Sequence, residues 1–380
     1  MKKILLLHTN YQNKGGEDIA VENETIFLKE KYIVETLLFS NQVDNIFKQI
    51  FFFIINKNIE SINQLNSKLE TFKPDIVYVH NTWFKASLGI FKLLDEKNIK
   101  TVVKLHNFRY FCSRTFLKSI HLGNNLICQA CGMNLKPRRL FNKYYETSLS
   151  KSFFLIIYGK KYYKLLKNSK FSIFVLTEFH KNFLGELGFD TKRISVFPNY
   201  LESAAESTIN PKNYILYAGR ISIEKGIKEL IETFSKVKNS NLKLKIIGTG
   251  PDFVSLKNKY ENQHILFLGE KSNIETIKII KDSKAVVTAT KLFEGQPTLL
   301  CEASSLGIPS IYPKTGGISE FFPDNYKLSF KQYDYKDLEN KILLLDKIDL
   351  LTVGQRNKVY IENYLDKEIL NNKLDNIFNE

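Results

Sequence analysis

Long hydrophobic runs are absent from this chain of 380 residues. A helix that crosses a bilayer needs roughly 20 consecutive apolar residues, and the longest apolar stretches, such as Phe51–Ile55 and Phe153–Tyr158, are much shorter. The apolar run near the start, Ile4–Leu7, is interrupted by His8, so it reads as a first strand rather than as a signal peptide. We therefore expect a cytoplasmic protein with no membrane-spanning helix.

Cysteine is scarce too, because the chain has only four. Four cysteines in a chain of this length do not form a disulfide framework. Cys112, Cys128 and Cys131 lie in an irregular stretch together with His121, and these four residues could form a structural zinc site. A single CxxC is only half of the usual zinc pattern, so reduced and partly buried cysteines are the favoured interpretation. No metal is expected to take part in the chemistry.

Acidic residues are too few to balance the basic ones, and the formal net charge is +15. The excess is concentrated in residues 135–174, where lysines and arginines alternate with aromatic residues and Glu146 is the only acid. This pattern is typical of a helix lying on an anionic membrane surface, and we expect contact with the inner leaflet there. The alternatives are a solvated basic face over a core stripe and a nucleic-acid surface. No helix-turn-helix or RNP pattern is present, so no nucleic-acid partner is expected.

Strand-like and helical patterns alternate along the chain, and the length favours two domains. This order predicts an α/β protein whose parallel sheets carry helices on both faces, with ligands at the carboxyl ends of the strands. The dinucleotide fingerprint GxGxxG is absent. The strand-like runs on which the prediction depends include Ile4–Leu7, Asp75–His80, Thr101–Leu105, Leu242–Ile247, Ile265–Leu268 and Ala285–Thr290.

One stretch, residues 285–313, combines a strand, a turn, a short helix and a second strand. Pro297 suits the first position of the helix, and Gly307 suits the position just past its end. Glu294 lies in the turn and Glu302 in the helix, so their spacing can aim two carboxylates at one cleft beside a helix N-terminus, which favours anions. The alternative is that Glu294 caps the helix and Glu302 is an ordinary solvated residue.

A second stretch, YILYAGRISIEKG at residues 214–226, decides between these readings. Arg220 and Lys225 flank a tight turn between a strand and a helix, where they can clamp a diphosphate. Taken together, the two stretches resemble the retaining glycosyltransferases of family 4. The resemblance spans nearly the whole chain and is sharp from about Ser172 to Glu320.

The resemblance implies the GT-B fold, in which two Rossmann-like, doubly wound domains face each other across a deep cleft. Residues 1–200 would form the acceptor-binding domain, with a C-terminal helix in residues 365–380 packing back on it. Residues 201–364 would form the domain that binds a nucleotide sugar, linked to uridine or guanosine diphosphate. The implied activity is transfer with retention of anomeric configuration, without an obligatory metal, in lipopolysaccharide, capsule or exopolysaccharide synthesis. The acceptor would be a lipid-linked or growing glycan.

The resemblance also implies roles for individual residues. Arg220 and Lys225 would stabilise the leaving diphosphate, Glu294 would hold sugar hydroxyls, and Glu302 would hold the ribose. Many family members have Glu-Gly-Phe-Gly where this chain has Glu294-Gly295-Gln296-Pro297, and Pro297 removes one backbone donor. The expected catalytic residues are Glu294, Arg220, Lys225 and His106, a histidine that follows a strand as His80 also does. The expected substrate-binding residues are Gly15, Gly16, Gly219, Gly248, Gly250, Gly269, Gly295, Gln296, Pro297, Thr298, Leu299 and Glu302.

Two other functions fit parts of the pattern. A nucleotide-sugar epimerase of the same architecture would use the donor site without a second substrate. A non-catalytic protein that binds nucleic acid or membranes, with a degenerate sugar site, would use only the basic surface. No carboxylate pair suits the double displacement of a retaining glycosidase, which favours a front-face mechanism in which the leaving phosphate helps to deprotonate the acceptor.

Overall fold

The computed structural model describes residues 1–11, 15–40, 46–83, 85–112, 127–132, 149–201, 211–237 and 241–379. Their contacts divide the chain into two compact units. Unit 1 consists of Met1–Phe111, Tyr158–Glu202 and Lys367–Glu380, and unit 2 consists of Cys112–Ile157 and Ser203–Asp366. The described residues 127–132 thus belong to unit 2, although unit 1 supplies the chain before residue 112 and after residue 157.

Unit 1 is built on a parallel sheet of six strands in the order β2-β1-β3-β4-β5-β6. Every pairing in this sheet is parallel, so each connection crosses over through a helix or a loop. The strands are β1 (Lys3–Asn10), β2 (Ile33–Ser40), β3 (Ile76–Val79), β4 (Lys100–Leu105), β5 (Ser172–Val175) and β6 (Ile194–Val196). The helices are α1 (Gly16–Lys29), α2 (Ile46–Ile55), α3 (Ile59–Phe72), α4 (Gly89–Glu96), α5 (Arg109–Cys112), α7 (Leu149–Asn168), α8 (Glu178–Glu186) and α15 (Lys367–Asn379). Of α7, the residues from Tyr158 onward belong to unit 1, and the earlier ones group with unit 2.

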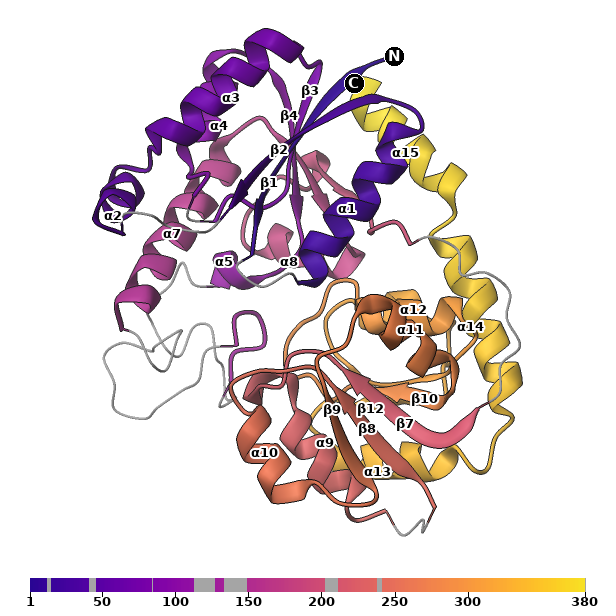
Figure 1. Cartoon of the computed structure of the whole chain (residues 1–380). Helices are drawn as coiled ribbons and strands as arrows, with labels where there is room; N and C mark the ends of the chain where they lie inside the picture. The colour runs from indigo at the N-terminus through magenta and orange to yellow at the C-terminus, as the bar shows by residue number, and fades with distance from the viewer. Residues whose placement is uncertain are drawn as a thin grey trace. The chain divides into compact units, whose positions relative to one another are not determined.

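The central strands β1 and β3 of the unit 1 sheet are buried on both faces, which explains why they read as continuous apolar runs. Successive side chains of a strand point to opposite faces, so Leu5 and Leu7 line one face while Ile4 and Leu6 line the other. The face with Ile4 and Leu6 packs against α1 and against Leu370 of α15. Figure 1 shows α1 and α15 on one side of this sheet and α3 and α4 on the other.

Unit 2 repeats this plan with the strand order β12-β11-β10-β7-β8-β9, again all parallel. Its core gathers the inward side chains of β7, β8 and β10 with those of α9 and α13. The strands are β7 (Lys212–Ala218), β8 (Lys243–Ile247), β9 (Ile265–Gly269), β10 (Ser283–Val287), β11 (Ser310–Lys314) and β12 (Ser329–Lys331). The helices are α9 (Ile227–Phe234), α10 (Phe253–Tyr260), α11 (Asn273–Lys281), α12 (Thr298–Ser305), α13 (Tyr335–Leu344) and α14 (Leu350–Tyr364), with short 3-10 turns at η2 (Ile223–Lys225) and η3 (Ile318–Phe321).

The two strand orders locate one switch point in each unit. In unit 2 the chain runs outward from β7 through β8 to β9 and then returns to the other side of β7 with β10. In unit 1 the reversal lies between β1 and β3. Ligands of open α/β sheets bind outside the carboxyl ends of the strands at such reversals, so the candidate sites lie in the loops after β7 and β10 in unit 2 and after β1 and β3 in unit 1.

Candidate functional site

The loop after β7 places two cations at the switch point of unit 2. β7 ends at Ala218, and the next residues are Gly219 and Arg220. Arg220 forms an ion pair with Glu224, and Lys225 closes the 3-10 turn η2. The hydroxyl of buried Tyr217 donates to the backbone oxygen of Arg220 at 2.9 Å, which anchors this turn to the strand.

The loop after β10 brings a carboxylate against these cations. Lys225 Nζ lies 2.6 Å from Glu294 Oε1, and Thr290 Oγ1 donates to the same oxygen at 3.0 Å. The side chains of Lys225 and Glu294 are 29% and 23% exposed, so both remain accessible to a ligand. The backbone oxygen of Glu294 accepts from Gly317 N at 2.8 Å. Arg220, Lys225 and Glu294 therefore gather where the sequence predicted a site.

Close backbone approach explains why glycine occupies two of these turns. Gly226 has φ +67°, and a Cβ there would lie 1.9 Å from the backbone oxygen of Ala289, in the loop after β10. Gly248, which follows β8, has φ +124°, and its Cβ would lie 2.0 Å from the backbone oxygen of Gly219. A side chain at Gly226 would push the β7 and β10 loops apart and separate Lys225 from Glu294.

The helix α12 points its first turn toward this carboxyl edge. Pro297 precedes its first residue, one position earlier than expected, and Gly307 has φ +71° just after the last turn, as predicted. The backbone N–H groups of Thr298 and Leu299 belong to the first turn, which has no acceptor within the helix. Because phosphates bind at such helix starts, these two residues are suited to the role that the sequence assigned to them.

Two side chains of the same region differ in their surroundings. Gln296 is buried and hydrogen-bonds the Cys301 side chain, so its amide already has a partner within unit 2. Burial raises the pKa of Glu302 to about 7, which leaves this carboxyl partly protonated near neutral pH. Carboxyl groups with a raised pKa are common at ligand sites, where the surrounding protein shields them from water.

A brace from the first half of the chain supports the Glu294 loop, and the sequence reading missed it. The backbone oxygen of Gln129 accepts from Phe293 N at 2.7 Å. The Gln129 amide contacts the side chain of Gln332, which donates to the backbone oxygen of Thr290 at 3.4 Å. The segment 127–132, with buried Cys128 and Cys131, is therefore part of the wall of the unit 2 site.

The histidines after β3 and β4 form a pair in unit 1. His80 Nδ1 lies 2.9 Å from His106 Nε2, and the two rings stack with centroids 5.2 Å apart. Burial and the nearby Lys104 ammonium hold the pKa of His106 well below its usual range, and burial also lowers the pKa of His80. His106 is therefore neutral at pH 7, and its role at the donor sugar stays a prediction.

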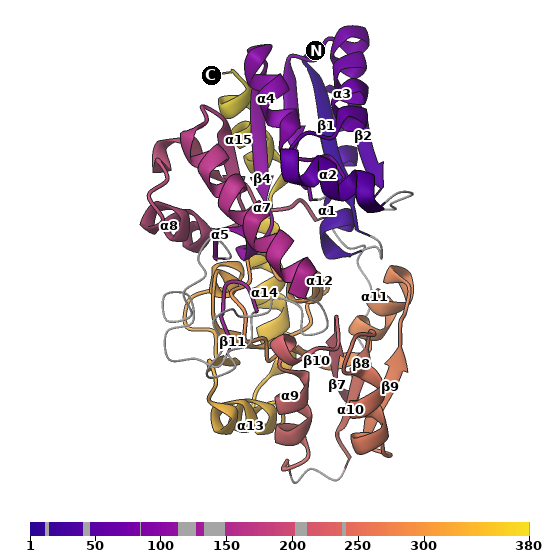
Figure 2. The ribbon, with the colours of Figure 1, turned by 90° about the vertical axis from the view of Figure 1, so that its left-hand side faces the viewer.

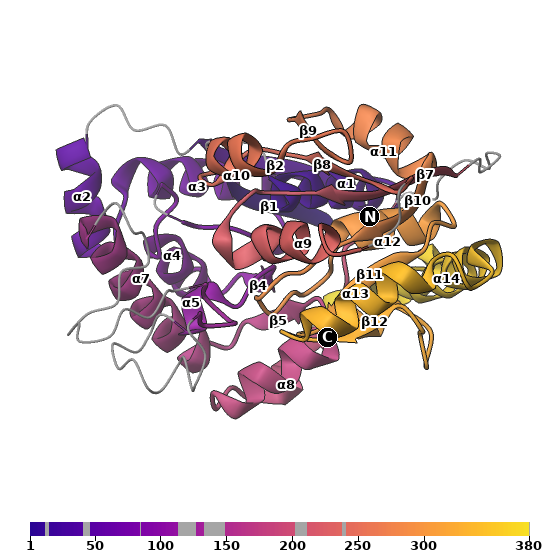
Figure 3. The same ribbon diagram turned by 90° about the horizontal axis from the view of Figure 1, so that it is seen from below.

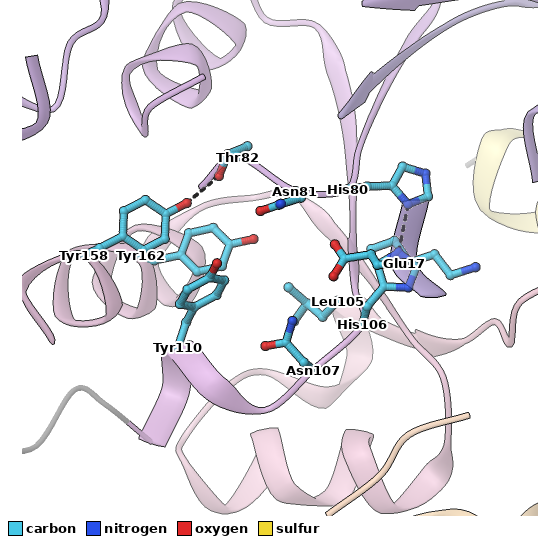
Figure 4. Close-up of a pocket in the computed structure, with 11 residues that line it drawn as sticks. Glu17, His80, Asn81, Thr82, Leu105, His106, Asn107, Tyr110, Tyr158 and Tyr162 are labelled. Atoms are coloured by element: carbon cyan, nitrogen blue, oxygen red, sulfur yellow. Dashed lines mark hydrogen bonds between the residues drawn. The ribbon is translucent and has the colours of Figure 1, made fainter. Parts of the chain in front are cut away.

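A small polar pocket lies at the same edge of the unit 1 sheet (Figure 4). Tyr158 closes one side and bonds Thr82 Oγ1 at 2.6 Å. Glu17, from the first turn of α1, accepts from Tyr11 at 2.8 Å, and burial raises the pKa of its carboxyl. The lining residues are Glu17, His80, Asn81, Thr82, Lys104, Leu105, His106, Asn107, Tyr110, Tyr158 and Tyr162.

The expected glycine pair Gly15-Gly16 begins α1 beside this pocket. Gly15 N donates to Asp18 Oδ2 at 2.7 Å, and His8 Nε2 lies 2.9 Å from Asp18 Oδ1. Burial alone would raise the pKa of Asp18, but the hydrogen bonds from His8, Gly15 and Tyr11 outweigh it and lower the pKa. These hydrogen bonds to Asp18 fix Gly15 at the start of α1, in the part of the chain that the sequence associated with phosphate and acceptor.

The remaining predictions have mixed outcomes. Gly250 follows β8 at φ +158°, and Gly269, the last residue of β9, has φ +69°; both lie at the carboxyl edge of unit 2, as expected. Among the described residues, no group of three or more His, Cys, Asp and Glu side chains could hold a metal. His121 lies outside those residues, and so do residues 135–148 of the predicted basic segment. In the described parts of the chain, no helix is long and apolar enough to cross a membrane.

The unit 2 site can bind an anionic ligand and hold hydroxyl groups. Arg220 and Lys225 supply positive charge, the first turn of α12 supplies N–H donors, and the carboxylates of Glu294 and Glu302 can accept from hydroxyls. Cations and N–H groups next to carboxylates match a ligand that combines phosphates with a sugar.

Comparison with known proteins agrees with this geometry. Residues 201–363 match the family model described as "Glycosyl transferases group 1". CapM of Staphylococcus aureus, a capsular polysaccharide biosynthesis glycosyltransferase, is 27% identical over 203 residues, which cover 50% of this chain and 52% of that protein. The chain spans about half the length of the curated relatives that it matches.

Solved structures share the fold over the full length of the chain. The lipopolysaccharide outer core galactosyltransferase WaaB superposes with a TM-score of 0.64 at 17% identity, covering 99% of both chains. HepE of Anabaena, solved in complex with UDP and glucose, superposes with a TM-score of 0.67 at 14% identity and also covers 99% of both chains. The predicted GT-B fold is confirmed by these neighbours and by the two parallel sheets. Residues 201–363 of this chain are thus similar to the group 1 glycosyltransferases, and the whole chain shares the fold of solved glycosyltransferases.

Proposed function

We propose that this protein transfers a sugar from a nucleotide-sugar donor to a glycan acceptor during the synthesis of a surface polysaccharide. The observation that carries the proposal is the contact between Lys225 and Glu294 across the switch point of unit 2, with Arg220 in the same turn. This cluster lies inside the part of the chain that matches the family model. The names of CapM, a capsular enzyme, and AmsD, an amylovoran enzyme of Erwinia amylovora, support the polysaccharide context.

The side chains suggest how the reaction proceeds with retention of configuration. The bond between the anomeric carbon and the donor phosphate breaks, and its electron pair goes to the leaving diphosphate, which Arg220, Lys225 and the start of α12 stabilise. An acceptor hydroxyl attacks from the same face, and its proton passes to the leaving phosphate oxygen. Glu294 orients the sugar through its hydroxyls, and Glu302 binds the ribose. None of these steps requires a metal ion.

The donor is a uridine or guanosine diphosphate sugar, and the acceptor is a lipid-linked or growing glycan. UDP occupies the related folds of HepE and TarM, which favours uridine as the first base to test. Peripheral contact with the inner face of the plasma membrane belongs to the same proposal, because a lipid-linked acceptor resides there. The epimerase alternative has no observation of its own in its favour.

A transfer assay with two variants tests this function. Lys225→Ala removes one of the two cations that stabilise the leaving diphosphate. The loss of one such stabilising group lowers kcat by a factor of about 10²–10³. Lys228→Ala is the matched control, because Lys228 lies one helical position into α9 and pairs only with Glu232 among the described residues. We expect the rate of nucleoside diphosphate release to fall by that factor in Lys225→Ala and to stay near the wild-type rate in Lys228→Ala. The wild-type enzyme should form an α-linked product from an α-linked donor. If Lys225→Ala turned over at the wild-type rate, the assignment of Lys225 to the donor site would be wrong. A product of inverted configuration would contradict the retaining mechanism.

A further inference from the structure

The hydroxyl group of Thr290 lies between two groups of the loop after β10. Leu292 N donates to Thr290 Oγ1 at 3.2 Å, and Thr290 Oγ1 donates to Glu294 Oε1 at 3.0 Å. A hydroxyl has one proton to donate, and Leu292 N is itself a donor, so the proton of Thr290 points at the Glu294 carboxylate. Thr290 is 2% exposed, which keeps water from competing for this proton. Because threonine is branched at Cβ, its χ1 angle is restricted as well.

The two carboxylate oxygens of Glu294 have different surroundings. Oε1 accepts from Lys225 Nζ at 2.6 Å and from Thr290 Oγ1 at 3.0 Å. Among the residues that the structure describes, none bonds Oε2, and the side chain of Glu294 is 23% exposed. An ionised carboxylate has about four acceptor positions. Oε2 is therefore available to a hydroxyl group of a ligand, while Oε1 is held by the protein.

The loop that carries Thr290 is attached to two helices of unit 2. Lys291 Nζ lies 2.6 Å from a carboxylate oxygen of Glu229 on α9, and the hydroxyl of Tyr333, just before α13, donates to the backbone oxygen of Lys291 at 3.3 Å. Gln332 donates to the backbone oxygen of Thr290 at 3.4 Å. Figure 2 and Figure 3 both show α9 and α13 side by side, and both helices pack into the core of unit 2. The backbone of Thr290 is therefore fixed independently of Glu294.

Lys225 is a less constant partner of Glu294 than Thr290 is. Its ammonium group ends a flexible four-carbon chain, and its side chain is 29% exposed. In the reaction proposed above, a diphosphate carries more negative charge than one carboxylate and attracts this ammonium group. The single proton of Thr290 is already directed at Glu294, so a bound donor leaves that contact in place.

We propose that Thr290 is a positioning residue for the donor sugar. Its hydroxyl holds Glu294 Oε1, so that Oε2 accepts from a hydroxyl of the sugar while Lys225 turns to the diphosphate. This inference rests on the proposed function, because it assigns Thr290 to the sugar half of the same donor site. It follows that the sugar half depends on the Thr290 hydroxyl and that the nucleotide half binds without it.

Titration calorimetry on Thr290→Val and Thr290→Ser tests this role. The probes are UDP, UDP-glucose, UDP-galactose, UDP-N-acetylglucosamine, GDP and GDP-mannose. Valine keeps the shape of threonine without the hydroxyl, whereas serine keeps the hydroxyl. Because a hydrogen bond to a charged group is lost, Thr290→Val should bind the sugar nucleotide about 10–100-fold more weakly than the wild type and the bare diphosphate within about twofold. Thr290→Ser should restore most of the affinity for the sugar nucleotide.

Thr315→Val is the matched control for a loss of stability in the same loop. Thr315 is buried too, and its hydroxyl donates to the backbone oxygen of Leu292 at 3.3 Å. This variant should bind both kinds of nucleotide like the wild type. If it weakens the sugar nucleotide as much as Thr290→Val does, loop stability explains the loss and the inference is overturned. Thr290→Ala, which adds no atoms, replaces Thr290→Val if the latter loses its native melting transition.

A double-mutant cycle with Glu294→Ala separates positioning from direct contact with the ligand. If Thr290 acts only through the carboxylate, Thr290→Val should weaken sugar-nucleotide binding in the wild-type background and have no further effect in Glu294→Ala. Additive losses would show that Thr290 contacts the ligand itself and would overturn the positioning role. A wild type that binds none of the probes would refute the proposed function and this inference together. A wild type that binds a sugar nucleotide no more tightly than Thr290→Val does would refute this inference alone.

Discussion

At the scale of single residues, Glu302 links the unit 2 site to pH. Its pKa in the folded protein is about 7, above the ordinary value of 4.5, because the carboxyl is buried on α12. The folded state therefore holds its proton more tightly than the unfolded chain. Stability from this group is complete at low pH and is lost as pH rises from about 4.5 through about 7, by at most roughly 3 kcal/mol.

Glu302→Gln tests this linkage, because glutamine has the shape of the protonated acid and does not titrate. We expect the two proteins to melt at similar temperatures at pH 5 and the wild type to melt several degrees lower than the variant at pH 8. Thermal denaturation across this range measures the difference directly. Parallel melting curves at all pH values would show that the carboxyl of Glu302 is ordinary.

Lys104 is a second residue whose environment sets a clear expectation. Lys104 and Glu24 are fully buried in unit 1 with their charged atoms 2.7 Å apart, and the Tyr78 hydroxyl donates to Glu24 at 2.6 Å. Removing one partner of such a pair leaves a buried charge and costs about 3–5 kcal/mol. Lys104→Met should therefore lower the free energy of unfolding by that amount.

The double variant Lys104→Met/Glu24→Gln provides the control for this pair. Its glutamine is neutral and still accepts from Tyr78, so most of the lost stability should return. Urea denaturation measures both variants. If the double variant is as unstable as Lys104→Met, packing rather than unpaired charge explains the loss.

At the scale of elements, the turn at Gly226 is the most sensitive part of the site. Gly226→Ala introduces a Cβ 1.9 Å from the Ala289 backbone oxygen, in addition to a left-handed φ. Gly269→Ala has nearly the same φ, +69°, but nothing within 4 Å of its Cβ. The control should lose only about 1–2 kcal/mol from its backbone conformation, whereas Gly226→Ala should lose clearly more and should also abolish transfer. Equal melting temperatures for the two variants would contradict the close contact between the β7 and β10 loops.

Elements with a local pattern could be predicted from the sequence, and those made by distant residues could not. Buried strands such as β1 and β3 appear as apolar runs because both faces are covered, and Gly307 marks the end of α12 because only glycine readily adopts its φ. The brace at Gln129 depends on a contact with Phe293, 164 positions later by residue number, and no local pattern records such a pairing. The exposure of Phe51 and Ile54 on α2 was not predicted, because a short apolar run looks the same whether it is buried or exposed.

At Lys104, the sequence contains a signal from which a buried ion pair could have been predicted. It stands within the apolar run Thr101–Leu105, where a lysine in a buried strand indicates a buried partner. The cluster of Arg220, Lys225 and Glu294 was easier to predict, because all three residues follow strands of one sheet whose carboxyl ends meet at one edge. Which carboxylate each cation contacts depends on loop geometry, so the pairs Lys225–Glu294 and Arg220–Glu224 emerged only from the structure.

At the scale of the whole molecule, the chain consists of two parallel six-stranded sheets, each with its own switch point. The alternation of strands and helices predicted both sheets. The grouping of 112–157 with unit 2 was not predicted, because it arises from contacts between segments far apart in sequence. The net charge of +15 favours binding to anionic partners in general, and Arg220 and Lys225 place two of the cations at the unit 2 site.

The central claim is that the cations at the switch point of unit 2 bind a nucleoside diphosphate sugar. Its most direct test is thermal denaturation of the wild type and of Lys225→Ala against a panel of uridine, guanosine, adenosine and cytidine diphosphates and their sugars. A ligand at about 100 times its dissociation constant adds roughly 2.7 kcal/mol, which raises the melting temperature by a few degrees. We predict that one nucleotide series stabilises the wild type and has a much smaller effect on Lys225→Ala. No shift with any nucleotide, or equal shifts in both proteins, would contradict the account.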